Sequence, residues 1–320
     1  MRYRPLGSTE LKVSAIGFGA SPLGDVFGQV SVEECRDTVL NAVDYGINFF
    51  DVSPYYGLTV AEERLGSALH SVRKDVIVAT KCGRYGVDHF DYSPRTITLE
   101  FEQSLRRLRT DCVDLLQVHD IEFGDLHQII HETLPAIWQL QQQGKTRYVG
   151  ISSYWPGLLA RVAQQVPVDT VLSYCHWNLM MDDMDRELTP VASANNIGLI
   201  NASPLHMGLF GGTAVAAWHP APEDVKQAAS DVVELCRAFS VESSTVALHA
   251  CLQHPIVATT LIGMRTRAQV QANCAALDFD PPAELVAAIR HRVAPLFNTS
   301  WSSGLPENQH NPLHLGDKSA

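Results

Sequence analysis

The chain has 320 residues, of which 46% are hydrophobic and 18% charged, and its formal net charge is −11. This composition supplies a large core, and the acidic balance lacks the basic footprint of proteins that bind nucleic acid or anionic membranes. No stretch approaches the roughly 20 apolar residues of a membrane span, and the N-terminus lacks the apolar segment of a signal peptide. The seven cysteines are odd in number and have no C-x-x-C spacing, so we expect a cytoplasmic protein without disulfides or zinc.

Short apolar runs rich in β-branched residues alternate with helical patterns along the chain. Eight runs are predicted as strands, at residues 14–18, 47–50, 76–80, 113–118, 147–151, 169–173, 197–200 and 257–262. Runs that are apolar on both faces are typical of parallel strands covered by helices. The alternation continues without a change in composition, which favours one closed (β/α)8 TIM barrel over two domains. We expect a single domain over 1–305 and a flexible tail over 306–320.

The segments between the runs carry turn and helix signals. Residues 3–13 (YRPLGSTELKV) are predicted to form a hairpin that closes the bottom of the barrel. Residues 31–34 (SVEE) and 59–62 (TVAE) match the capping-box pattern, and residues 93–94 (SP) match an N-cap followed by proline. The 56 residues from 201 to 256 include a Gly- and Pro-rich stretch, which predicts a long binding loop or lid at the C-terminal face.

Four ionisable side chains follow three neighbouring strands of the predicted barrel. Asp51 and Tyr56 follow the second strand, Lys81 the third and His119 the fourth, which is the face where barrel enzymes keep their sites. Alone, each has an ordinary structural explanation, such as a hydrogen-bonded core histidine or a solvated lysine. Together they predict proton transfer at an oxygen, with Lys81 paired to Asp51 and lowering the pKa of a neighbouring tyrosine.

Two other patterns are weaker. Gly17-x-Gly19 follows a strand, but Ser21 and Pro22 stand where a Rossmann helix would start and the third glycine is mis-spaced. We therefore expect these glycines to let the first loop approach a cofactor or substrate. His119 and Asp120 have no further His or carboxylate at ligand spacing, so no metal site is predicted.

Several motifs together resemble one known family over nearly the whole chain. These are DVSPYYG (51–57), ATKCG (79–83), LLQVHD (115–120), GISSY (150–154) and ASPLHMG (202–208). In this order they are similar to the aldo-keto reductases. The resemblance implies a (β/α)8 barrel that binds NAD(P)(H) without a Rossmann domain. It also implies an Asp-Tyr-Lys-His tetrad, which falls on Asp51, Tyr56, Lys81 and His119.

The resemblance also implies a set of cofactor contacts. They are Gly19 in the first loop, Ser152 and Ser153 at the nicotinamide carboxamide, Ser173 (or Tyr174) near that ring, Ser203, Leu205 and Gly208 on the phosphate side, and Gly263, Arg265, Gln269 and Asn273 on the adenine side. Ala202 stands where many members have an aromatic residue that stacks on the nicotinamide. Gln269 replaces an arginine that often binds the 2′-phosphate of NADP in the family, so NAD is expected. NADP stays an alternative, because Arg265 or Arg267 could bind that phosphate.

Within the family, the chain is most similar to members that oxidise the anomeric C1 hydroxyl of a pyranose, such as L-galactose or L-fucose, to a lactone. Loop positions suggest an aromatic platform from Phe27, Tyr55, Tyr85, Trp177 and Trp301, and hydroxyl contacts from Asp120, Glu122 and His176. The alternatives are an aldehyde or ketone reductase, a pyridoxal-type alcohol dehydrogenase, a non-catalytic regulatory subunit and a sugar-binding barrel without chemistry. The expected partner is a small sugar, and the expected state a monomer or small homo-oligomer.

Overall fold

Eight parallel strands form a closed barrel in the computed structural model, which describes residues 1–212 and 215–309. The strands are β3 (Ile16–Gly19), β4 (Phe49–Asp51), β5 (Ile77–Cys82), β6 (Val113–Val118), β7 (Thr146–Ser153), β8 (Thr170–Tyr174), β9 (Gly198–Ala202) and β10 (Thr259–Gly263). They pair in chain order, and β10 closes the barrel against β3. Each predicted run overlaps one of these strands, and the (β/α)8 prediction is confirmed.

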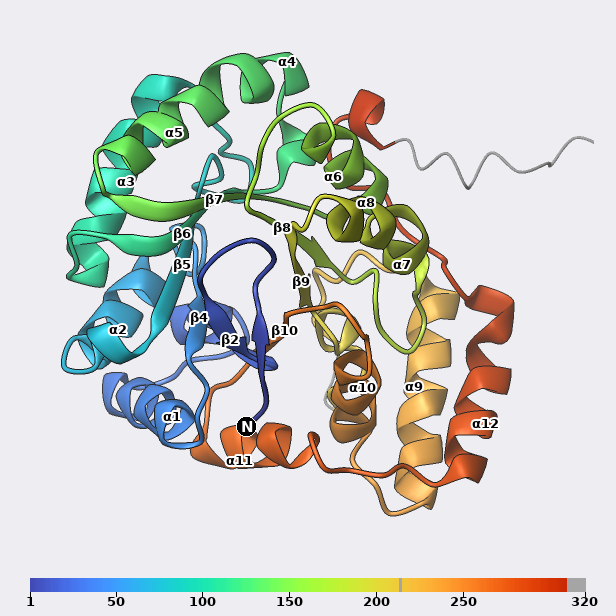
Figure 1. Cartoon of the computed structure of the whole chain (residues 1–320). Coiled ribbons are helices and arrows are strands. Elements are labelled where there is room, and N and C mark those ends of the chain that lie inside the picture. The colour runs from blue at the N-terminus through green and yellow to red at the C-terminus, as the bar shows by residue number, and fades with distance from the viewer. Residues whose placement is uncertain (213–214, 310–320) are drawn as a thin grey trace, which may run out of the picture.

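Helices surround the barrel (Figure 1). They are α1 (Val32–Asp44), α2 (Val60–Leu69), α3 (Pro94–Leu108), α4 (Leu126–Gln128), α5 (Leu134–Gln142), α6 (Pro156–Ala163), α7 (Asp183–Glu187), α8 (Thr189–Ala194), α9 (Glu223–Ala238), α10 (Ser243–Leu252), α11 (Arg267–Ala275) and α12 (Ala283–Val293). None of the helices in the described ranges is long and apolar enough to cross a membrane. All seven cysteines are free thiols.

The N-terminal hairpin closes the end of the barrel at which the strands begin. It consists of β1 (Tyr3–Pro5) and β2 (Lys12–Ser14), and its side chains Leu6, Leu11 and Val13 join the interior cluster. That cluster contains Phe49, Ile77, Ala79, Leu115, Leu172, Ile200, Ala258 and Leu261. Gly7, at φ +57, turns so close to β9 that a Cβ would lie 2.3 Å from the Gly198 nitrogen. The predicted bottom plug is confirmed.

The helix-start signals have different outcomes. Residues 31–34 form the predicted capping box, and Ser93 accepts a hydrogen bond from Thr96 N. The box predicted at 59–62 is wrong, because Thr59 has φ +83 and caps nothing with its side chain. Glu62 instead turns inward and lies fully buried between α2, β5 and α3. Glu62 matches the acidic position of a capping box in the sequence, but in the structure its side chain is part of the core.

The long connection after β9 contains α9 and α10, and the Gly- and Pro-rich stretch precedes them at the C-terminal face, where the structure describes its residues 203–212 and 215–222. After α12, the chain returns across that face to a short 3-10 helix at Pro306–Asn308. Asn308 is buried and donates to the Glu122 and Gly124 carbonyl oxygens at 3.0 and 2.9 Å. The domain boundary at 305 stays a prediction. Of the tail expected over 306–320, the structure describes residues 306–309, where Asn308 is buried, and residues 310–320 lie outside the described residues.

Replacing Glu62 by alanine should lower the free energy of unfolding by about 3 kcal/mol, the scale for removing one partner of a buried ion pair. The carboxylate accepts from Arg107 Nε and Thr80 Oγ1, both at 2.6 Å, and both donors would lose their partner. Urea unfolding measures the loss. Glu63→Ala, on the exposed face of the same helix, is the matched control and should change stability by no more than about 0.5 kcal/mol. Equal effects of the two substitutions would contradict the buried role of Glu62.

Candidate active site

On β4, β5 and β6, the interior positions at the C-terminal ends are polar, whereas those below them are apolar. Side chains alternate along a strand, so Asp51 lies two positions above Phe49, Lys81 above Ala79, and Gln117 above Leu115. Register pairs bring these strands together, with Asp51 opposite Ala79 and Lys81 opposite Gln117. The sequence thus places a ring of functional groups on top of a hydrophobic layer.

Lys81 and Asp51 form the predicted ion pair at the centre of this ring. Lys81 Nζ donates to Asp51 Oδ1 and to the Val52 carbonyl oxygen at 3.0 Å, while Gln117 Nε2 donates to Asp51 Oδ2 at 2.9 Å. Both charged side chains are buried. Burial lowers the pKa of Lys81, but the charge of Asp51 and the contact with Tyr56 more than offset it, so the pKa rises and the ammonium stays charged.

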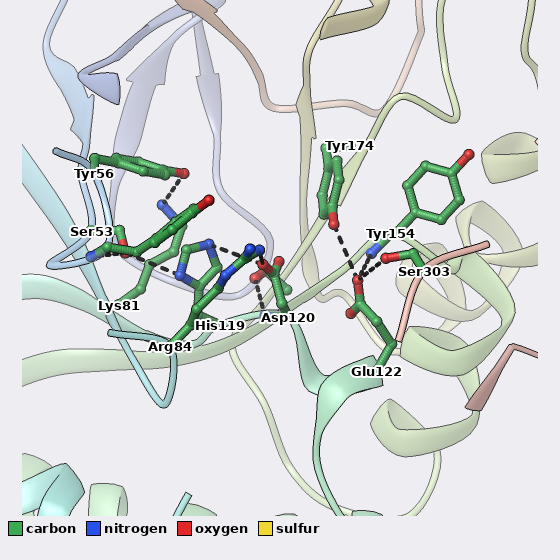
Figure 2. Close-up of polar contacts among 12 residues, drawn as sticks. Ser53, Tyr56, Lys81, Arg84, His119, Asp120, Glu122, Tyr154, Tyr174 and Ser303 are labelled. Atoms are coloured by element: carbon green, nitrogen blue, oxygen red, sulfur yellow. Dashed lines mark hydrogen bonds and ion pairs between the residues drawn. The ribbon is translucent and has the colours of Figure 1, made fainter. Parts of the chain in front are cut away.

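Tyr56 extends this ion pair toward the open face of the barrel. Lys81 Nζ lies 3.3 Å from the Tyr56 hydroxyl, as Figure 2 shows. The expected lowering of a tyrosine pKa is wrong for this structure: burial raises the pKa of Tyr56, the positive charge of Lys81 opposes the rise, and Asp51 and Asp120 add to it. The reason is that burial of the phenol outweighs the nearby positive charge of Lys81, and the negative charges of Asp51 and Asp120 act against that charge.

His119 lies beside the phenol as a neutral imidazole. Its ring meets that of Tyr56 edge-on at 5.8 Å between centroids, and Nδ1 is 3.0 Å from Ser53 Oγ. Burial and the charges of Lys81 and Arg84 hold the pKa of His119 well below 6.5. A neutral ring has one donor and one acceptor nitrogen, so it can orient a hydroxyl without adding a charge.

A second ion pair borders the first. Arg84 Nη1 donates to Asp120 Oδ2 at 2.6 Å, and the guanidinium carbon lies 4.0 Å from the centre of the Tyr55 ring. Asp120 is buried, and its Oδ2 is 3.6 Å from His119 Nε2. The two ion pairs therefore lie on either side of the imidazole.

A cavity of about 300 Å³ opens beside these groups. Its lining includes Arg84, Phe123, Tyr154, Tyr174, Met207 and Trp301. Tyr174 OH donates to Glu122 Oε1 at 3.1 Å, and the second oxygen of this buried carboxyl has no hydrogen-bond partner in the described part of the chain. Burial and the charge of Asp120 raise the pKa of Glu122 to about 7.

The predicted substrate residues divide into two groups. Tyr55, Asp120 and Trp301 lie at the tetrad or in the cavity wall. Three others do not: His176 is fully buried with Nδ1 2.8 Å from Asp183, Trp177 packs edge-on against His254, and Tyr85 packs against His89. Phe27 is largely exposed and contacts Trp218. Loop position alone did not distinguish inward from outward side chains.

The predicted nicotinamide contacts divide between the barrel interior and the side that faces the helices, because successive side chains along a strand point to opposite faces. Ser152 belongs to the interior face, where its hydroxyl accepts from Asp120 N at 3.1 Å. Ser153 turns to the helices and accepts from Trp155 N at 3.0 Å. In β8 the interior residues are Leu172 and Tyr174, so Ser173 faces the helices and Tyr174 occupies the position expected for it. Tyr174 is the register partner of Ala202. An aromatic ring therefore lies beside the position at which many family members have a stacking aromatic residue and this chain has alanine.

The remaining predicted cofactor residues surround the same end of the barrel. Gly19 and Gly263 are register partners at the last positions of β3 and β10. Ser203, Leu205 and Gly208 belong to a loop with positive φ at Ser203, His206, Met207 and Gly208, a backbone form that can turn N–H groups toward an anion. Arg265 N donates to Gln269 Oε1 at 2.7 Å at the start of α11, which also carries Asn273. Of these residues, the positive-φ loop is the part that suits the diphosphate of a dinucleotide.

Sequence reasoning missed Arg84, Gln117 and Ser53 as parts of this assembly. Gln117 and Arg84 had detectable signals: Gln117 is a polar residue inside a strand, and Arg84 comes three residues after Lys81. Ser53 follows Asp51 by two positions in a turn and had no distinguishing signal. Across the described ranges, no group of three or more His, Cys, Asp or Glu side chains could hold a metal ion.

Comparison with known proteins agrees with this geometry. The chain matches the Aldo/keto reductase family over residues 15–293. It is 42% identical over 318 residues to the L-galactose dehydrogenase of Arabidopsis thaliana, covering 96% of this chain and 99% of the relative. It is 26% identical to the D-threo-aldose 1-dehydrogenase of a Pseudomonas species, covering 87% and 94% of the two chains. An aldo-keto reductase of Bacillus halodurans, solved in its holo form, has a TM-score of 0.73 at 27% identity over 95% of this chain and 98% of that one. This chain belongs to the aldo-keto reductase family of oxidoreductases.

Proposed function

We propose that the protein is a nicotinamide-dependent aldose 1-dehydrogenase that oxidises the C1 hydroxyl of L-galactose, L-fucose or a related sugar to the lactone. The observation that carries the proposal is the buried Asp51–Lys81 pair, whose ammonium lies 3.3 Å from the Tyr56 hydroxyl beside a polar and aromatic cavity. The 42% identity to an L-galactose dehydrogenase over almost the whole chain supports a sugar substrate.

Each residue of the tetrad has a separate role in the proton transfer. Tyr56 takes the proton of the C1 hydroxyl, and Lys81 stabilises the phenolate form that accepts it. The Lys81–Asp51 pair holds the ammonium in place. Neutral His119 orients the same oxygen through a hydrogen bond. The bound coenzyme supplies the hydride acceptor.

NAD is the proposed coenzyme. The 203–208 loop and the start of α11 would hold its diphosphate and adenosine parts, and Ser152 and Tyr174 would face the nicotinamide. The two guanidinium groups that are candidates for binding the 2′-phosphate of NADP are already engaged, since Arg265 Nη1 donates to the Phe27 carbonyl oxygen at 2.5 Å and Arg267 pairs with Asp37 at 3.3 Å. Gln269 is also bonded to the Arg265 backbone. These contacts support NAD over NADP.

Initial rates across L-galactose, L-fucose, D-arabinose and D-galactose, each with NAD and with NADP, test the proposal. We expect reduction of NAD with L-galactose or L-fucose at the highest kcat/KM, and a smaller value with NADP. Tyr56→Phe removes the proton acceptor while keeping the ring, so it should lower kcat by at least about 100-fold and leave the dissociation constant of NAD nearly unchanged.

Reduction of simple aldehydes by NADH without oxidation of any sugar would contradict the substrate assignment. Wild-type turnover by Tyr56→Phe would contradict the role of the phenol. A preference for NADP would show that the engaged guanidinium groups rearrange on binding.

The rate of sugar oxidation should rise with pH between 6 and 9. A general base acts in its deprotonated form, and burial raises the pKa of Tyr56 above its ordinary value near 10, so the active fraction increases throughout this range. The measurement is kcat/KM for the sugar at saturating coenzyme against pH. A flat profile from pH 6 to 9 would show that the phenol is already ionised or that proton transfer does not limit the rate.

A further inference from the structure

Both cations of the site are neutralised by buried carboxylates. Lys81 pairs with Asp51, and Arg84 pairs with Asp120, with the Arg84 side chain 16% and the Asp120 side chain 4% exposed. Glu122 adds a third carboxyl behind the cavity wall, where the lining residue Tyr174 donates to it, and it forms no ion pair within the described ranges. Among the described residues, the cavity therefore has no unpaired positive charge, and an anionic ligand would have to displace the carboxylate of Asp120 from Arg84 or bind close to it.

Arg84 is the cation that a cavity ligand would meet first. It lines the cavity, and its guanidinium lies over the Tyr55 ring at 4.0 Å and within 5.1 and 5.4 Å of the Phe90 and Phe123 rings. This aromatic cage fixes the plane of the guanidinium. A fixed guanidinium is a strong bidentate receptor for carboxylates and phosphates, so its use by Asp120 removes a binding site for such groups.

The backbone of Asp120 is held firmly in place. It lies in the left-handed region at φ 51 and ψ 58, which is uncommon for a residue other than glycine. Its N–H donates to Ser152 Oγ at 3.1 Å, and its carbonyl oxygen accepts from Tyr92 OH at 2.8 Å. The Tyr92 hydroxyl also contacts the His119 carbonyl oxygen at 2.9 Å, so one buried phenol braces the turn that carries both side chains. These bonds fix the backbone position from which the Asp120 side chain reaches Arg84.

We infer that Asp120 is a specificity-determining residue that restricts the site to uncharged polyhydroxylated substrates. By occupying the Arg84 guanidinium, it excludes sugars that carry a carboxylate or a phosphate. The inference rests on the proposed function and narrows its substrate class to neutral aldoses. A neutral sugar hydroxyl does not compete for Arg84 as an anion does, and it can still hydrogen-bond to the free lone pairs of the carboxylate.

Asp120→Asn tests the inference, since the amide keeps the shape and removes the charge that Arg84 pairs with. The substrates are the best neutral aldose and the corresponding hexuronate, whose C6 is a carboxylate. We expect the ratio of kcat/KM for the hexuronate to that for the aldose to rise at least about tenfold in the variant, and the gain to shrink at high salt. The affinity of the enzyme–NAD complex for the same hexuronate, measured by intrinsic fluorescence, should rise in parallel and requires no turnover.

Two further variants isolate the cause. Glu122→Gln removes a neighbouring carboxylate that is not paired with Arg84, and it should leave the ratio within about twofold of wild type. In Arg84→Met/Asp120→Asn the gain should disappear, because the guanidinium that would bind the anion is gone. A ratio unchanged by Asp120→Asn, an equal gain in Glu122→Gln, or a gain that persists in the double variant would each overturn the inference.

Failure of the proposed function has a different result. If the wild-type protein oxidises no aldose, the sugar-dehydrogenase assignment falls, and the uronate-binding measurement still decides whether Asp120 masks Arg84. If aldoses are oxidised and uronate affinity does not change in Asp120→Asn, only the masking role is wrong.

Discussion

The buried pairing of Lys81 with Asp51 is the interaction on which the site depends. A lone ammonium or carboxylate at this position would be costly to bury, and neither residue would be placed there without the other. A buried ion pair adds little net stability compared with apolar residues of the same size. Its position on top of the apolar barrel layer is therefore best explained by what it does to Tyr56, whose hydroxyl lies 3.3 Å from the shared ammonium.

The same principle extends outward through the cavity. Arg84 and Asp120 repeat the arrangement of a cation neutralised by a carboxylate, and neutral His119 lies between the two pairs with a pKa well below its ordinary value. The result is a site with fixed dipoles and charges but no excess positive charge. Such a site can polarise a sugar hydroxyl in a low-dielectric setting while disfavouring anionic ligands.

Periodicity predicts the barrel and the convergence of side chains that follow neighbouring strands, whereas the choice of Tyr56 over Tyr55 rests on the family resemblance. Apolar runs locate the strands, and residues just past a parallel strand must meet at one face. The finer assignments differ from the structure where they depend on which face of a strand a residue occupies, or on the direction in which one side chain points. Ser173 is predicted near the nicotinamide with Tyr174 as the alternative, and alternation within β8 puts only Tyr174 inside the barrel. Glu62 matched a capping pattern, but its carboxylate was needed by Arg107 in the core.

The direction of the Tyr56 pKa shift was beyond sequence reasoning for a different reason. It depends on the balance between burial of the phenol and how much of the Lys81 charge remains after pairing with Asp51, and both are three-dimensional quantities. Likewise, His176 and Trp177 lie close in sequence to the end of β8 yet pack against Asp183 and His254, away from the cavity.

In the proposed reaction, Tyr56, Lys81 and His119 act on the oxygen of C1 while hydride leaves that same carbon. Oxidation of an aldose deuterated only at C1 tests this position of attack. We expect the reduced coenzyme to carry the deuterium, as measured by mass spectrometry, and the product to be the lactone. Reduced coenzyme without the label, or oxidation at another carbon of the ring, would contradict it.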